Sequence, residues 1–177
     1  KQVYEIHIAT LTPGDKGTDE KKRSEIKTKK KKEAAKAAEL IGGKYYCLGF
    51  EDLYIFYNRE SINKTTALIR KIQPEIVFTS SPADYMLDHE MTSLIVQTAC
   101  FACGIKNMDA EEAPFEHVPY LYYCDAMEGK DKLGNPVKPS IYIDISEEMP
   151  HKKKMLACHE SQRSWLLKHH KIDEYIL

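Results

Sequence analysis

The stretch IVFTSSPADYMLDHE, residues 76–90, contains the clearest change of secondary structure in the sequence. It opens with apolar and β-branched residues, as a buried strand does, and the residues that follow it have the apolar spacing of a helix. Between these two patterns, residues 84–89 hold two aspartates, a tyrosine and a histidine. The stretch therefore predicts a strand, a polar loop and a helix in succession, which is the repeating unit of parallel α/β proteins.

The same alternation of strands and helices continues on both sides of this stretch. Gly42 and Gly43 are expected to end the first helix. Ser61 is expected to cap the second helix, and Pro74 to end it. Right-handed crossovers leave few alternatives, so we expect an α/β fold whose mainly parallel sheet is covered by helices on both faces, a three-layer sandwich. Strands are predicted at residues 3–11, 45–48, 75–79, 119–124 and 140–145, and helices at residues 26–41, 61–73, 91–102 and 151–168.

The composition limits the classes of protein to which the chain could belong. Its 177 residues, of which 42% are hydrophobic, suffice for one packed domain. A formal net charge of −1 argues against a nucleic-acid partner, and the apolar runs fall far short of the roughly 20 residues that span a membrane. The odd number of scattered cysteines suits buried free thiols, so we expect a soluble, cytoplasmic protein. Cys100 and Cys103 have the spacing of a metal or redox pair, but core packing is favoured because they fall in a helical pattern.

Three polar segments follow predicted strands, at residues 12–18, 50–52 and 81–90. Ligands of parallel sheets bind outside the carboxyl ends of the strands, so these segments are candidates for a site. A neutral imidazole at His89 could ligate a metal while a nearby carboxylate holds its other nitrogen. The plainer alternative is that an aspartate of this loop caps the helix. The sequence lacks HExxH, GxGxxG, P-loop and GxSxG motifs, so any site must be assembled from separate loops.

The last predicted helix carries two polar residues on an apolar stripe. His159 and Gln162 fall at helical spacing between Met155 and Leu166, and buried polar groups need hydrogen-bond partners. These two side chains form either a structural network or a wall of the site, and we expect both to point away from bulk solvent. The lysine run at residues 29–32 is interpreted as the solvated side of its helix rather than as a phosphate site.

Five segments together resemble the family of LmbE-like, or PIG-L-type, N-acetylglucosaminyl deacetylases. The most specific is Asp84-Tyr85-x-x-Asp88-His89 between a strand and a helix. The resemblance implies one Rossmann-like domain over residues 1–177 that holds a zinc ion, which activates water against the acetamido group of a sugar. The segments are IHIATLTPGDKGT (residues 6–18), KKKKEAAKAAELIGG (29–43), YYCLGFED (45–52), PEIVFTSSPADYMLDHEMTS (74–93) and KKKMLACHESQ (152–162).

The resemblance also implies a role for individual residues. His89 would be a zinc ligand, and an N-acetylated amino sugar would be the substrate. Homo-oligomerisation is left open. Two residues would be catalytic and four would bind substrate, namely Asp88 and Tyr85 for catalysis and Asp84, Asp52, His159 and Gln162 for substrate.

The sequence departs from the family pattern in two respects. The family's first motif, His-Pro-Asp-Asp, supplies two further ligands and the general base, and it does not occur here. We therefore expect a chain that is truncated at both ends. Met86 stands where many members carry a histidine that polarises the carbonyl, and a thioether cannot donate a hydrogen bond. Another donor, Tyr85, His117 or His159, would have to take that role.

The function expected from these observations is zinc-dependent removal of an N-acetyl group from an N-acetylglucosamine-type sugar. The metal would lower the pKa of a water molecule toward about 7, and a carboxylate would transfer its proton to the leaving amine. The alternative is a non-catalytic carbohydrate-binding or structural relative that has lost the metal. A nucleotide-binding domain is disfavoured, because TPGDKGT is a poor phosphate loop.

Overall fold

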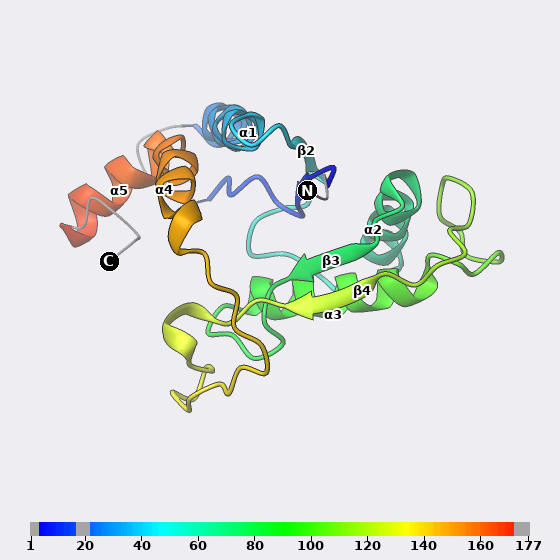
Figure 1. Cartoon of the computed structure of the whole chain (residues 1–177). Coiled ribbons are helices and arrows are strands. Elements are labelled where there is room, and N and C mark those ends of the chain that lie inside the picture. Colours follow the sequence, from blue (N-terminus) through cyan, green and yellow to red (C-terminus); the bar gives the residue numbers. More distant parts are fainter. Residues whose placement is uncertain (1–3, 17–21, 172–177) are drawn as a thin grey trace. The chain divides into compact units, whose positions relative to one another are not determined.

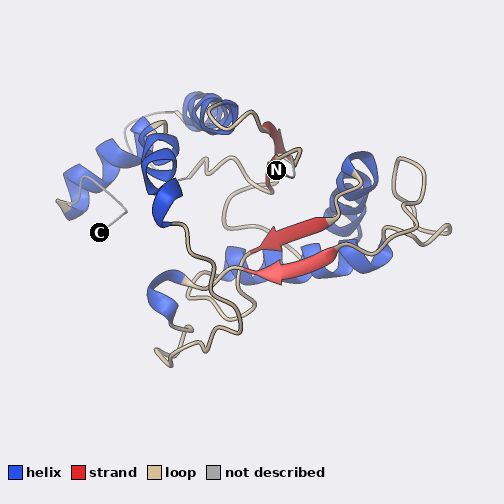
Figure 2. Ribbon diagram, in the orientation of Figure 1, coloured by secondary structure: helices blue, strands red, loops and turns tan. Residues whose placement is uncertain are grey.

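A computed structural model describes residues 4–16 and 22–171 of the chain (Figure 1). The chain divides into two compact units, one of residues 1–52 and 143–177 and the other of residues 53–142. This division does not decide whether the chain is a single domain, which stays a prediction. Figure 2 shows helices, strands and loops in both units. Within the described ranges, the helices lack the length and apolarity needed to cross a membrane.

The first unit contains a parallel strand pair and the helix that connects its strands. Strand β1 (His7–Thr10) pairs with β2 (Lys44–Cys47), with His7 opposite Lys44. Helix α1 (Arg23–Glu39) buries Ile26 and Ala38 and ends at a turn in which Gly42 has a φ of 67°. A glycine adopts this left-handed conformation without strain, so the predicted glycine stop is confirmed. The short helix η2 (Ser146–Glu148) and helices α4 (Met149–Ala157) and α5 (Glu160–His170) complete the unit.

The second unit contains another parallel strand pair with two helices packed together beside it. Strands β3 (Ile76–Thr79) and β4 (Tyr120–Tyr123) run side by side in Figure 1. Helices α2 (Arg59–Ile72) and α3 (Leu87–Ala102) contact each other, and the short helix η1 (Met127–Gly129) follows β4. The buried core consists of Ile69, Ala99, Cys100 and Cys103, with Val77 and Leu121 of the strands packed against it.

The mixed α/β architecture and the parallel strand pairs confirm the coarse prediction from the sequence. The cysteine pair is also as expected, because Cys100 and Cys103 are buried free thiols in the core. Burial raises the pKa of the Cys100 thiol to about 12, so the reactive thiolate is strongly disfavoured there.

The helix cap predicted at Ser61 was wrong, and so was the alternative of an aspartate cap on the next helix. Helix α2 begins after Asn58, whose side chain accepts from the backbone N–H of Ser61, while the Ser61 hydroxyl accepts from that of Asn58. Ser61 is thus the third helical residue of a capping box. Helix α3 begins after Met86, so neither Asp84 nor Asp88 is its cap residue.

The predicted strand at residues 140–145 was also wrong. No strand is formed there, and the side chains of Ile141, Tyr142 and Ile143 are exposed. Alternating β-branched and aromatic residues favour a strand only where another strand offers backbone partners. In the described part of the chain, no strand pairs with this segment.

The single late helix predicted at residues 151–168 is two helices, because the chain breaks at His159, whose ψ is 58°. The first turn of α5 is capped from α1 instead. Glu33 accepts hydrogen bonds from the Ser161 backbone N–H at 2.9 Å and from its hydroxyl at 2.5 Å. These bonds satisfy donors that a continuous helix would have used, so the stripe from Met155 to Leu166 does not lie on one helix.

Candidate functional site

The loop between β3 and α3 is shaped by its own polar side chains. The Ser81 hydroxyl bonds to the backbone of Ala83, and Asp84 Oδ1 accepts from the Met86 N–H at 2.9 Å. Asp84 is only 4% exposed. These bonds fix the path of the chain into α3, and they place His89 in the first turn of the helix, as predicted.

Asp84 holds the imidazole of His89. Its Oδ2 lies 3.1 Å from His89 Nδ1, and the His89 side chain is 42% exposed. A histidine whose Nδ1 donates to such a carboxylate presents the lone pair of Nε2 to a ligand. Metal-binding histidines in proteins are commonly held in this way, by a carboxylate on the nitrogen that does not face the metal. The ring of Tyr85 meets that of His89 edge to face, with 6.1 Å between the centroids.

Asp88 connects the start of α3 to the loop that precedes α2. Its Oδ2 accepts from the backbone N–H of Leu53 at 2.8 Å, and Leu53 has a left-handed φ of 67°. The rings of Tyr54 and Phe56 follow in this loop and are exposed. The contact gives Asp88 a structural partner, and its predicted catalytic role stays a prediction.

A second polar cluster lies in the first unit, where β1 and β2 end. Thr12 Oγ1 donates to Asp52 Oδ1 at 3.1 Å, and Asp15 Oδ1 accepts from the Asp52 N–H at 3.3 Å. Asp15 is buried and accepts from Arg23 Nε at 2.7 Å. Burial would raise the pKa of Asp15, but the hydrogen bond from Arg23 helps to hold it below its ordinary value. The predicted gathering of Thr12 and Asp52 is therefore present within this unit.

His159 and Gln162 pack against α1 of the same unit. Gln162 Oε1 accepts from Lys30 Nζ at 3.3 Å, and both His159 and Gln162 are partly buried. Burial lowers the pKa of His159, as does nearby Lys30, while Glu33 opposes the shift. The prediction that these two side chains avoid bulk solvent is confirmed.

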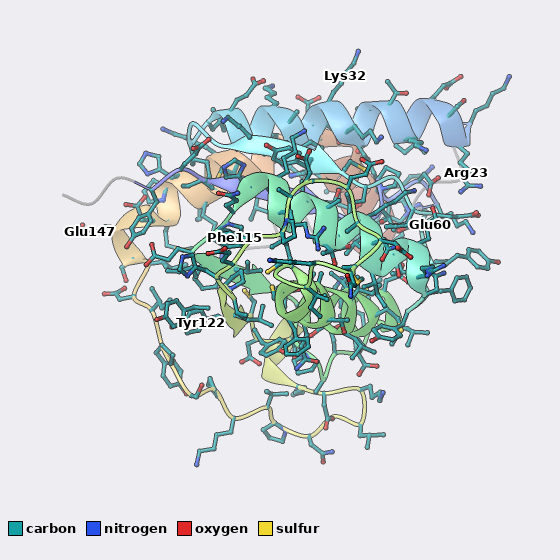
Figure 3. All side chains as sticks on the ribbon, turned by 90° about the vertical axis from the view of Figure 1, so that its right-hand side faces the viewer. Arg23, Lys32, Glu60, Phe115, Tyr122 and Glu147 are labelled. Atoms are coloured by element: carbon teal, nitrogen blue, oxygen red, sulfur yellow. The ribbon has the colours of Figure 1, made fainter. Side chains whose placement is uncertain are left out.

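The lysine run of α1 was only partly interpreted correctly. Lys32 is exposed and extends away from its helix in Figure 3, as a solvated lysine does. Lys30 is instead partly buried, and burial lowers its pKa. Its position could have been found from the sequence, since Ile26, Lys30, Glu33 and Ala37 follow one another at helical spacing on one face.

The structure thus divides the predicted site residues between the two units. Asp84, Tyr85, Asp88 and His89 come together in the second unit. The three remaining residues are in the first unit, where Asp52 lies beside Thr12 and where His159 and Gln162 lie beside α1. Within residues 4–16 and 22–171, no group of three metal-ligating side chains is preassembled. The role of His89 as a metal ligand stays a prediction.

The chain has relatives of two kinds. It is 27% identical over 164 residues to a diacetylchitobiose deacetylase of Thermococcus kodakarensis, covering 86% of this chain and 57% of the relative. It is 25% identical over 107 residues to a 4-oxalmesaconate hydratase of Pseudomonas putida, covering 56% of this chain and 42% of the relative. The chain spans about half the length of these curated relatives.

Solved structures of both kinds share the fold. The 4-carboxy-2-hydroxymuconate hydratase of Pseudomonas putida matches with a TM-score of 0.77 and 20% identity, over 95% of this chain and 72% of that one. The N,N'-diacetylchitobiose deacetylase of Pyrococcus horikoshii matches with a TM-score of 0.77 and 23% identity, over 94% and 63%. The sequence pattern of the family described as PIG-L, GlcNAc-PI de-N-acetylase, matches residues 1–100. The chain belongs to this PIG-L family, as its motifs indicated.

Proposed function

We propose that the protein is a zinc-dependent hydrolase that removes the N-acetyl group from an N-acetylglucosamine-type sugar. The observation that carries the proposal is the pairing of buried Asp84 with His89 Nδ1, in a chain of the PIG-L family. This pairing leaves Nε2 of the imidazole available to a metal. The finer description of the fold, a Rossmann-like three-layer sandwich, belongs to the same proposal.

His89 would hold the zinc through Nε2, together with ligands from outside the loop that carries it. When bound, zinc supplies Lewis-acid polarisation of the acetyl carbonyl and activation of water. Asp84, whose Oδ2 lies 3.1 Å from Nδ1, would keep the hydrogen of the imidazole on that nitrogen and orient the ring. Tyr85, whose ring meets that of His89 at 80°, would donate a hydrogen bond to a substrate oxygen, which Met86 cannot do.

The other predicted roles form part of the proposal. Asp88 would act in catalysis while it holds the backbone of Leu53. Asp52, His159 and Gln162 lie in the first unit, and substrate binding by these residues stays a prediction. Each of the last two lies against a charged or polar group of α1, which gives its side chain a defined orientation.

A second candidate function is the hydration of an unsaturated carboxylic acid, because some relatives are hydratases. The deacetylase is favoured because the diacetylchitobiose deacetylase relative matches 86% of this chain, whereas the hydratase relative matches 56%. A non-catalytic relative is the remaining alternative.

The test is acetate release by the complete protein supplied with zinc, followed by proton NMR. N,N'-diacetylchitobiose is the deacetylase substrate, and 4-carboxy-2-hydroxymuconate is the hydratase substrate. We expect acetate from the sugar, no change of the muconate, and loss of acetate release in His89→Ala. Hydration of the muconate by the wild type would replace the proposal with the second candidate. Inactivity toward a panel of acetylated sugars and the muconate would favour the non-catalytic alternative.

A further inference from the structure

The segment of residues 129–137 is a tight hairpin whose shape is set by Asp131. The Asp131 carboxylate accepts from the backbone N–H groups of Leu133 and Asn135 and from the Asn135 side chain. Gly134 has a left-handed φ of 81°, and the Val137 N–H donates to the Gly129 carbonyl. The bonds constrain the backbone from which the Lys132 side chain projects.

Lys132 reaches from this hairpin to the helix that carries His89. Its Nζ lies 2.9 Å from Glu90 Oε2, across a sequence separation of 42 residues. The Glu90 side chain is only 10% exposed, and its Oε1 accepts from the backbone N–H of Asp84 at 3.3 Å. Glu90 therefore connects Lys132 with the backbone of the residue that holds the imidazole.

Two buried carboxylates lie close together here, and each has a partner of its own. Asp84 is paired with His89, and Glu90 is paired with Lys132. Buried carboxylates are costly unless they are paired, and adjacent ones repel each other. Lys132 is the cation paired with Glu90 in the described part of the chain. Without it, the buried Glu90 carboxylate that accepts from the Asp84 N–H would lose its charge partner.

We propose that Lys132 is a positioning residue for His89, because its ion pair with Glu90 fixes the backbone of Asp84 and so the carboxylate that holds Nδ1. The consequence is one imidazole tautomer with Nε2 free of hydrogen. This inference rests on the proposed function in one respect, the binding of a metal by His89 Nε2.

The hairpin supplies a matched control. Lys130 is paired with Glu128 at 3.4 Å, but both side chains are exposed. Lys130→Met removes one positive charge from the hairpin, as Lys132→Met does, but it leaves the pair of Lys132 and Glu90 in place. Lys132 is itself 61% exposed, so Lys132→Met is expected to fold.

The experiment is long-range nitrogen–proton NMR of the His89 ring in the metal-free complete protein, assigned by the signals missing in His89→Gln. We expect well-separated nitrogen shifts in the wild type and in Lys130→Met, converging shifts in Lys132→Met, and restored separation in Lys132→Arg. A spectrum of Lys132→Met identical to that of the wild type would overturn the proposal.

A double-mutant cycle provides a second measurement if Lys132→Met proves unstable. Glu90→Gln should produce the same convergence, and adding Lys132→Gln should change it no further, because the two residues act through one contact. Independent, additive changes would contradict the proposal. The NMR experiment uses neither zinc nor sugar. A failed acetate assay would therefore leave the NMR result intact, and a failed NMR experiment would leave the acetate assay intact.

Discussion

Asp84 and Glu33 are both buried carboxylates near a histidine, yet their partners differ in kind. Both oxygens of Glu33 are bound by Ser161, so this carboxylate caps a helix. Asp84 binds the backbone with one oxygen and His89 with the other, and His89 remains partly exposed. The comparison shows that a buried acid near a histidine can serve to cap a helix or to pair with the imidazole, and that its partners tell the two cases apart.

The largest effect on stability is expected from Glu33→Ala. The change removes the cap of α5 and leaves the Ser161 N–H without its partner, so the free energy of unfolding should fall by about 2–3 kcal/mol. Urea denaturation measures this quantity. Glu39→Ala, at an exposed position of α1, the helix that carries Glu33, should change the free energy of unfolding by less than about 0.5 kcal/mol. Equal effects of the two substitutions would remove the distinction between a cap and a solvated acid.

Gly14→Ala should have the next largest effect. Gly14 has a φ of 68°, and an added Cβ would lie 3.2 Å from the Lys30 side chain. The left-handed conformation costs about 1–2 kcal/mol, and crowding of Lys30 should add to it. Gly134→Ala is the control, because its φ is 81° and nothing lies within 4 Å of the added atom. A smaller loss of stability at Gly14 than at Gly134 would show that Lys30 does not pack tightly under this turn.

The smallest effect concerns pH and His159. Burial and Lys30 hold the pKa of folded His159 below its ordinary value of 6.5, so the unfolded chain binds the proton more tightly. Stability contributed by this residue is therefore complete above about pH 7 and is lost as the pH falls through 6.5. Thermal unfolding of His159→Gln should depend less on pH in this window than that of the wild type. The same pH dependence in both proteins, with exposed His151→Gln as the control, would contradict the assigned environment.

Local patterns in the sequence were sufficient for most elements and for part of the site. The apolar spacing predicted the helix that became α3, and the loop before it placed His89 in its first turn. The break at His159 could not be predicted, because Glu33, which caps α5, is 128 residues away from Ser161. The contact of Lys132 with Glu90 was missed for the same reason, since pairs of polar residues leave no periodic signal in a sequence.

Isothermal titration of zinc into the metal-free complete protein tests most directly whether the Asp84 and His89 pair is a metal-binding element. Loss of a ligand should abolish tight binding in His89→Ala, and loss of its orienting partner should weaken binding about 10- to 100-fold in Asp84→Asn. His151→Ala is the matched control, because His151 is also paired with a carboxylate, at 2.9 Å from Glu148, but on the exposed surface. We expect that control to bind zinc as the wild type does. Equal zinc affinity in His89→Ala and the wild type would show that the Asp84 and His89 pair serves only the structure of its loop.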